Sequence, residues 1–150
     1  FGARPVSAFL PTLSLHLNRL ASLDTIVATN LHADILSDLA AALAGSLGIA
    51  PTGNLDPERR YPSMFEPIHG SGVDIMGKGI ANPVGTFWSV AMLLGHLGAA
   101  RAAHGVMSAI EQVTADPKLR TRDLGGSATT RQVTDAVCRR IVDGTSDARR

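Results

Sequence analysis

The pattern of apolar and polar positions predicts a strand, a helix and a second strand in the first half of the chain. Residues 25–29 are a short β-branched apolar run, which is typical of a buried strand. Apolar residues then recur at helical spacing over residues 31–43, and Asn30 can cap this helix. The apolar stripe of that helix comprises Ile35, Leu36, Leu39 and Leu43. Residues 64–68 predict another short strand.

Loops and helices dominate the rest of the chain. Residues 51–62 are rich in turn formers and predict a polar loop, and residues 69–82 predict a tight, glycine-rich loop. Pro83 suits the first turn of an apolar helix that ends at Leu97. Further helices are predicted over residues 99–115 and from Thr129 or Thr130 through Val133, Val137 and Ile141, followed by a frayed tail over residues 143–150. Strands that alternate with helices indicate an α/β fold, here with an incomplete sheet flanked by helices.

Composition excludes several classes of protein. The net charge is +1, so the chain lacks the basic surface expected of a nucleic-acid-binding or membrane-surface protein. No apolar run reaches the roughly 18 residues that span a bilayer, and the start does not resemble a signal peptide. The one cysteine, Cys138, fits a reducing cytoplasm, where we expect the protein to reside. The chain begins with Phe rather than Met, which indicates a piece of a longer protein.

Asp34 and Asp38 are the first candidate site. Their spacing places both carboxylates on one face of the predicted helix, where like charges repel each other. A hard cation such as Mg²⁺ or Mn²⁺ relieves this repulsion, and it commonly takes one or two carboxylates together with water and substrate. Alternatively, Asp34 complements the helix dipole and Asp38 is simply solvated.

The second candidate site follows the strand at residues 64–68. Glu66 and His69 precede glycines that let the backbone approach a ligand closely, and exposed amide groups in such a loop can hold phosphate. Asp74 could accept hydrogen bonds from ribose hydroxyls, which favours NAD over NADP. The loop has neither a dinucleotide fingerprint nor a Walker A motif, so a purely structural loop is the alternative.

Four motifs in order resemble the metal-dependent β-decarboxylating dehydrogenases, which include isopropylmalate, isocitrate, D-malate and tartrate dehydrogenases. The resemblance covers residues 23–142, and its motifs are residues 30–38, 65–71, 77–83 and 123–126. The spelling at His32-Ala33 and over residues 54–65 is most similar to the tartrate dehydrogenase/decarboxylase (D-malate dehydrogenase) branch. The implied fold is the C-terminal part of an isopropylmalate-dehydrogenase-like domain. Residues 1–22 do not resemble the family and stay unassigned.

The resemblance also implies roles for individual residues. Asp34 and Asp38 would bind Mg²⁺ or Mn²⁺, and Glu66 would lie by the nicotinamide ribose of NAD. The residues that would line the adenosine half of the site are His69, Gly70, Ser71 and Asn82. Asp74 and Ile75 stand where NADP-using relatives carry Lys-Tyr. Asp123 lies near the cofactor in the family pattern, without a definite role.

The implied reaction is the oxidation, with decarboxylation, of a 2-hydroxy dicarboxylic acid such as D-malate or tartrate. NAD takes the hydride, the metal acts as a Lewis acid, and family members are usually homodimers. The substrate-binding arginines, the catalytic tyrosine and the catalytic lysine of the family cannot be placed in this chain, and residues 9–14 lack the family's third metal-binding Asp. We therefore expect no catalytic residue here and no activity of the isolated chain. The alternative is a non-catalytic NAD- and metal-binding remnant or partner subunit.

Overall fold

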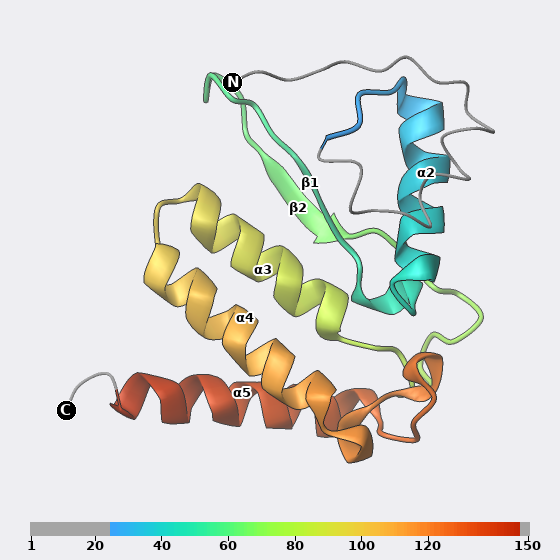
Figure 1. Ribbon diagram of the computed structural model, residues 1–150, viewed down its shortest axis with the longest axis vertical. Coiled ribbons are helices and arrows are strands. Elements are labelled where there is room, and N and C mark those ends of the chain that lie inside the picture. Colours follow the sequence, from blue (N-terminus) through green and yellow to red (C-terminus); the bar gives the residue numbers. More distant parts are fainter. Residues whose placement is uncertain (1–24, 148–150) are drawn as a thin grey trace. The chain divides into compact units, whose positions relative to one another are not determined.

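The computed structural model describes residues 25–147 of the 150-residue chain. These residues belong to two parts, one ending at Gly45 and the other beginning at Ser46, and each part is described by itself (Figure 1). Within the described range, no helix is long and apolar enough to cross a membrane.

In the first part, the described residues form one helix, α2 (Asn30–Leu43), close to the predicted range 31–43. Leu36 is buried, but Ile35 and Leu43 of the predicted stripe are exposed. Thr29 is the N-cap residue instead of Asn30, and its side chain makes no capping hydrogen bond. Asn30 is therefore the first helical residue, and the cap prediction was wrong by one position.

The strand predicted over residues 25–29 is absent. These residues belong to no ladder within the described chain, and the Val27 side chain is 95% exposed. A β-branched run becomes a strand only where a neighbouring strand supplies hydrogen bonds and a face to pack against. No such neighbour pairs with residues 25–29 among the described residues, so the prediction was wrong.

The second part begins with a short 3-10 helix, η2 (Leu47–Ile49), and a two-stranded antiparallel sheet. Strand β1 (Pro51–Asn54) pairs with β2 (Met64–Pro67) so that Thr52 lies opposite Glu66. The sequence predicts β2 but assigns β1 to a polar loop, which was wrong. Two of the residues that suggested a turn, Gly53 and Asn54, are the last two residues of β1. Pro51 is its first residue, a position where an edge strand tolerates proline.

Three helices complete the second part. Helix α3 (Val84–His96) packs against the sheet and against α4 (Ala100–Ala115), and α4 packs against α5 (Thr130–Asp147) (Figure 1). Two 3-10 helices, η3 (Pro117–Leu119) and η4 (Arg122–Leu124), join α4 to α5. All three helices were predicted, but α5 continues beyond Ile141 to Asp147.

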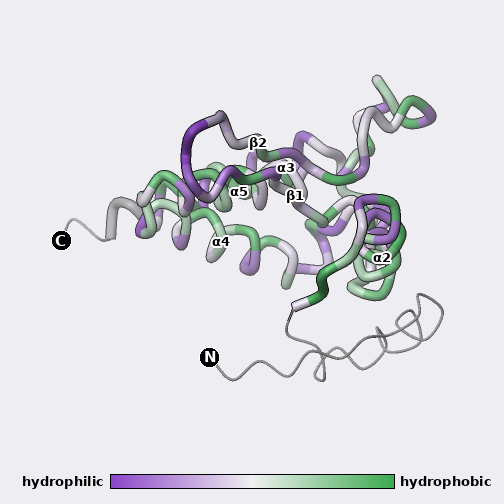
Figure 2. Tube along the Cα trace, turned by 90° about the horizontal axis from the view of Figure 1, so that it is seen from above, coloured by the Kyte–Doolittle hydropathy of each residue, from purple (hydrophilic) through white to green (hydrophobic). Residues whose placement is uncertain are grey.

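The core of the second part is built mainly by α3, α4 and α5. Hydrophobic and hydrophilic positions alternate along α4, because only one of its faces is buried (Figure 2). Val113 and Val137 are completely buried, and each contributes about 1.5 kcal/mol of transfer free energy. The buried cluster comprises Val84, Ala91, Val106, Ala109, Ile110, Val113, Ala128, Val133, Ala136 and Val137. Residues 68–83, which contain the candidate cofactor loop, connect β2 to this helical layer.

Candidate cofactor and metal site

The two candidate metal ligands lie on α2, in the first part of the chain. Asp34 and Asp38 are separated by one helical turn and are not buried, so their carboxylates share a face of α2. The Ser37 hydroxyl donates a hydrogen bond to the main-chain oxygen of Asp34, at 3.0 Å, which leaves the Asp34 carboxylate free of it. Both carboxylates can therefore accept a cation from solvent.

This pair fits part of a magnesium or manganese site. Two carboxylates are the usual protein contribution to bound Mg²⁺, which takes its other ligands from water and substrate. Within the described residues, no cluster of three or more His, Cys, Asp or Glu side chains could hold a metal alone. The stretch over residues 9–14, in which the third acid was sought, lies outside the described residues.

The candidate cofactor residues all lie in the second part of the chain. Glu66 is exposed on β2, and the others follow in the loop over residues 69–82. His69 is partly buried, with Nδ1 2.9 Å from the carbonyl oxygen of Gly70. Ser71 and Asp74 are exposed, so the Asp74 carboxylate is open to hydroxyl donors. Ile75 is partly buried, and its N–H donates to the oxygen of Gly72 at 3.0 Å.

Glycine gives this loop its accessible backbone. Gly70 has φ of +64°, a left-handed conformation that other L residues adopt only with strain. A Cβ atom placed on Gly70 would meet no atom within 4 Å, so the loop presents bare main chain to open space there. A ligand with phosphate groups can approach such a backbone closely.

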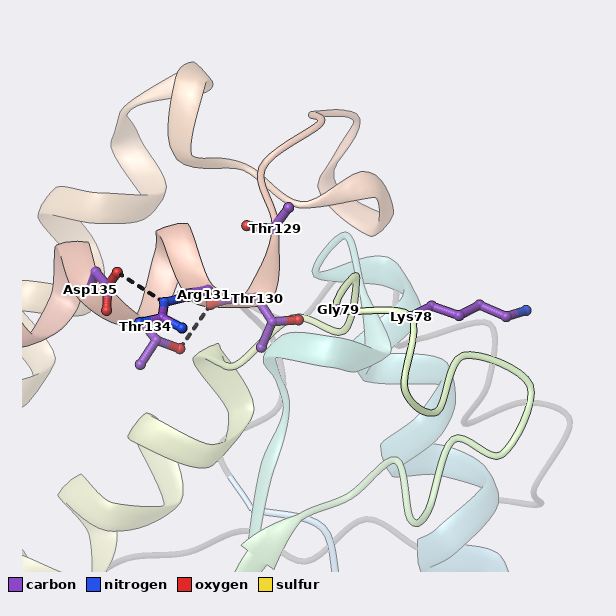
Figure 3. Close-up of a pocket in the computed structure, with 7 residues that line it drawn as sticks. All are labelled: Lys78, Gly79, Thr129, Thr130, Arg131, Thr134 and Asp135. Atoms are coloured by element: carbon purple, nitrogen blue, oxygen red, sulfur yellow. Dashed lines mark hydrogen bonds and ion pairs between the residues drawn. The ribbon is translucent and has the colours of Figure 1, made fainter.

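The exit of the loop is tied to the start of α5. The N–H of Thr130 donates to the oxygen of Gly79 at 2.9 Å, and the Thr130 hydroxyl donates to the oxygen of Ala81 at 2.5 Å. These contacts border a shallow pocket in which the Lys78 side chain extends away from α5 (Figure 3). The pocket is lined by Lys78, Gly79, Thr129, Thr130, Arg131, Thr134 and Asp135.

The N-terminal turn of α5 is occupied by its own capping groups. The N–H of Thr129 donates to Oε1 of Gln132 at 2.8 Å, and the N–H of Gln132 donates to the Thr129 hydroxyl. This is the reciprocal arrangement of a capping box. The sequence left Thr129 and Thr130 as alternative caps of this helix, and Thr129 is the residue that caps it. Thr130 instead holds the end of the loop over residues 69–82.

Asn82 ends the cofactor loop and caps α3. Its Oδ1 accepts a hydrogen bond from the N–H of Val84 at 3.0 Å, although Pro83 is the formal N-cap residue. Its Nδ2 donates to Oδ2 of Asp123 at 2.9 Å. Asn82 is only 7% exposed, so the side chain that caps α3 is also a buried link to η4.

Asp123 is held by two further hydroxyl groups. Ser46 Oγ donates to Oδ2 of Asp123 at 2.5 Å, and Thr121 Oγ1 donates to Oδ1 at 2.5 Å. Both donors are buried, whereas Asp123 as a whole residue is exposed. Partial burial raises the pKa of the Asp123 carboxyl, but the hydrogen bonds from Ser46, Thr121 and Asn82 outweigh burial and hold the pKa below its ordinary value of 3.8. The network therefore favours the carboxylate.

The sequence indicated Asn82 and Asp123 but missed Ser46 and Thr121. Ser46 lies 77 positions before Asp123, and no local pattern marks a serine as the donor to so distant a carboxylate. Thr121 could have been suspected, because it stands two positions before Asp123 and a short polar side chain can bond locally.

The sequence matches the isocitrate/isopropylmalate dehydrogenase family over residues 14–137. It is 71% identical over 120 residues to a probable tartrate dehydrogenase/decarboxylase of Agrobacterium vitis, a match that covers 80% of this chain and 33% of that protein. It is 53% identical over 125 residues to the decarboxylating D-malate dehydrogenase of Escherichia coli, covering 79% of this chain and 34% of that protein.

The structure agrees with these matches. It resembles the crystal structure of isocitrate dehydrogenase from Methylococcus capsulatus with a TM-score of 0.82 and 36% identity, covering 88% of this chain and 39% of that one. The chain spans about a third of the length of the curated relatives that it matches. The chain belongs to the isocitrate/isopropylmalate dehydrogenase family and has that family's α/β fold.

Proposed function

We propose that this chain carries the NAD- and metal-binding portion of an enzyme that oxidises and decarboxylates a 2-hydroxy dicarboxylic acid such as D-malate or tartrate. The observation that carries the proposal is the family match over residues 14–137, which contains every proposed site residue. The chain's similarity to tartrate and D-malate dehydrogenases favours tartrate and D-malate over the substrates of other family members. Assembly as a homodimer belongs to the same proposal.

Asp34 and Asp38 would hold Mg²⁺ or Mn²⁺ through solvent-accessible carboxylates on one face of α2. The bound cation would supply Lewis-acid polarisation of the substrate oxygens, and bound NAD would be the hydride acceptor. Glu66 would lie by the nicotinamide ribose. The adenosine half would be lined by His69, Gly70, Ser71 and Asn82.

Asp74 and Ile75 would select NAD over NADP. The exposed Asp74 carboxylate can accept hydrogen bonds from ribose hydroxyls, but it would repel the 2′-phosphate of NADP. The partly buried Ile75 adds no positive charge that would attract that phosphate.

The direct test is to titrate the purified chain with NAD, NADP and Mn²⁺ by calorimetry and then to follow NADH formation with D-malate and tartrate. We expect NAD to bind at least about tenfold more tightly than NADP, which corresponds to about 1.4 kcal/mol. We expect Asp34→Asn combined with Asp38→Asn to abolish Mn²⁺ binding, while Asp143→Asn, an exposed acid on α5, leaves it unchanged.

Each outcome separates the alternatives. NADH formation supports a complete reaction in this chain, and NAD binding without NADH formation supports the non-catalytic NAD- and metal-binding module. Absence of both NAD and Mn²⁺ binding contradicts the proposed function of the chain.

A further inference from the structure

The Asp123 carboxylate accepts hydrogen bonds from three side chains of its own chain. It accepts from Ser46 and Asn82 on Oδ2 and from Thr121 on Oδ1, and each of the three donor residues is at most 7% exposed. These donors come from the segment before η2, the end of the cofactor loop and the segment before η4. A carboxylate that accepts from three separate segments holds those segments together.

The orientation of the Asn82 amide is set by its two partners. Asp123 in its carboxylate form can only accept, so it must face Nδ2, and the N–H of Val84 can only donate, so it must face Oδ1. Flipping the amide would set donor against donor and acceptor against acceptor. The pair of bonds therefore fixes the side chain at the residue where the cofactor loop enters α3.

The packing around Asn82 leaves little room for adjustment. A Cβ atom on Gly48 would lie 2.9 Å from Cβ of Asn82 and 3.0 Å from Oδ2 of Asp123. The N–H of Gly48 also donates to Oγ of Ser46 at 2.9 Å, which orients that hydroxyl towards Asp123. Asn82 therefore lies in close contact with η2 on one side and is hydrogen-bonded to η4 on another.

We propose that Asp123 is a positioning residue for NAD binding: it does not touch the cofactor but holds Asn82, and through Asn82 the end of the loop over residues 69–82, in the shape that binds NAD. This inference rests on the proposed function. It gives Asp123 a definite role that acts through one hydrogen bond to one neighbour.

A reciprocal exchange of the two side chains tests the inference. In wild type, Nδ2 of Asn82 lies 2.9 Å from Oδ2 of Asp123. Asn82→Asp alone replaces this hydrogen bond by two carboxylates that repel each other. We expect this variant to weaken NAD binding by about tenfold. Adding Asp123→Asn restores one donor and one acceptor between the two positions, because the carboxylate introduced at position 82 still accepts from Val84 and the amide introduced at position 123 donates to it. The Ser46 hydroxyl, which donates to the same Oδ2 in wild type, must then turn to accept from that amide. We expect the double variant to bind NAD at least about threefold more tightly than Asn82→Asp alone, while both variants lack the wild-type amide that lines the proposed site.

Three further variants separate positioning from stability. Asp123→Ala removes the acceptor, and we expect it to weaken NAD binding by about tenfold. Thr121→Val removes only the bond to Oδ1, so we expect a lower melting temperature while NAD affinity changes less than about threefold. Asp143→Ala, the matched change at an exposed site, alters neither quantity.

Amide hydrogen exchange at Val84 gives a readout that needs no cofactor. We expect the Val84 amide to exchange faster in Asn82→Asp and to regain its protection in the double variant. Failure of the double variant to regain this protection overturns the inference, whatever NAD does. If wild type shows the expected exchange pattern but binds no NAD, the proposed function fails and the hydrogen-bond link stands.

Two binding results also overturn the inference. One is a loss of NAD affinity in Asn82→Asp that the added Asp123→Asn does not reduce at all, because Asp123 would then act by another route. The other is a loss in Thr121→Val as large as that in Asp123→Ala, because NAD affinity would then follow stability alone.

Discussion

Two aspartates in this protein have lowered pKa values for related reasons. The N–H of Tyr61 donates to Asp56 and lowers the pKa of its carboxyl, and the N–H groups of Glu58 and Arg60 add to this effect against a smaller opposing contribution from desolvation. At Asp123 the donors are side chains, two of them from distant segments. Asp56 therefore stabilises one turn, whereas Asp123 stabilises a tertiary junction.

The lowered pKa of Asp123 predicts an acid-sensitive contribution to stability. Its folded pKa lies below the ordinary value of 3.8, so its contribution is fully present above that value and is lost as the pH falls through the folded pKa. We expect the difference in unfolding free energy between wild type and Asp123→Asn to be constant near neutral pH and to shrink below pH 3.8. Urea unfolding of both proteins from pH 7 to pH 3 measures this difference in unfolding free energy. A difference that grows as the pH falls would contradict the lowered pKa of Asp123.

At the scale of elements, the sequence predicts best where one element carries its own signal. The helices α3, α4 and α5 have long apolar patterns, and α3 and α5 have local caps in Asn82 and Thr129, so these elements were recognised. The strands depend on partners that a local pattern does not show. Strand β1 was missed because Gly53 and Asn54 look like turn residues. The strand at residues 25–29 was predicted wrongly because its apolar pattern does not show whether another strand pairs with it. Ser46 was missed for the same reason, since its role exists only once Asp123 lies beside it.

The connection between η4 and α5 depends on Gly126. A Cβ atom there would lie 2.0 Å from the carbonyl oxygen of Arg120, which also accepts a hydrogen bond from the N–H of Ala128. We expect Gly126→Ala to destabilise the fold by about 1–3 kcal/mol, because the backbone must move apart and strain this turn.

Gly105 in α4 is the matched control for Gly126. A Cβ atom on Gly105 would meet nothing within 4 Å, so Gly105→Ala should stabilise the protein by about 0.5–1 kcal/mol through helix propensity. Denaturant unfolding of both variants compares the same substitution with opposite expected signs. Equal effects at the two positions would contradict the steric argument.

At the scale of the whole molecule, nearly all of the core lies after Ser46. Among the described residues, the first part contributes only Leu36 and Ala41 to the buried hydrophobic set, whereas the second part contains the cluster shared by α3, α4 and α5. The 14-residue helix α2 is also near the minimum length at which an isolated helix is stable in water. The core of the described residues therefore predicts that the second part is stable by itself.

We accordingly expect a fragment of residues 46–150 to fold without residues 1–45. Circular dichroism should show helical signal and one cooperative thermal transition for this fragment, because its buried cluster is intact. If residues 46–150 melt without a cooperative transition, the core cluster is insufficient and the assignment of stability is wrong.

The hydrogen bonds to Asp123 also bear on how the protein folds. Its bonds to Ser46 and Asn82 close stretches of 77 and 41 residues, and such closures cost chain entropy before they bring any gain. We therefore expect these contacts to form after the local helices, on the native side of the folding barrier. These hydrogen bonds would then slow unfolding and leave the folding rate nearly unchanged. They would therefore increase the kinetic stability of the folded state.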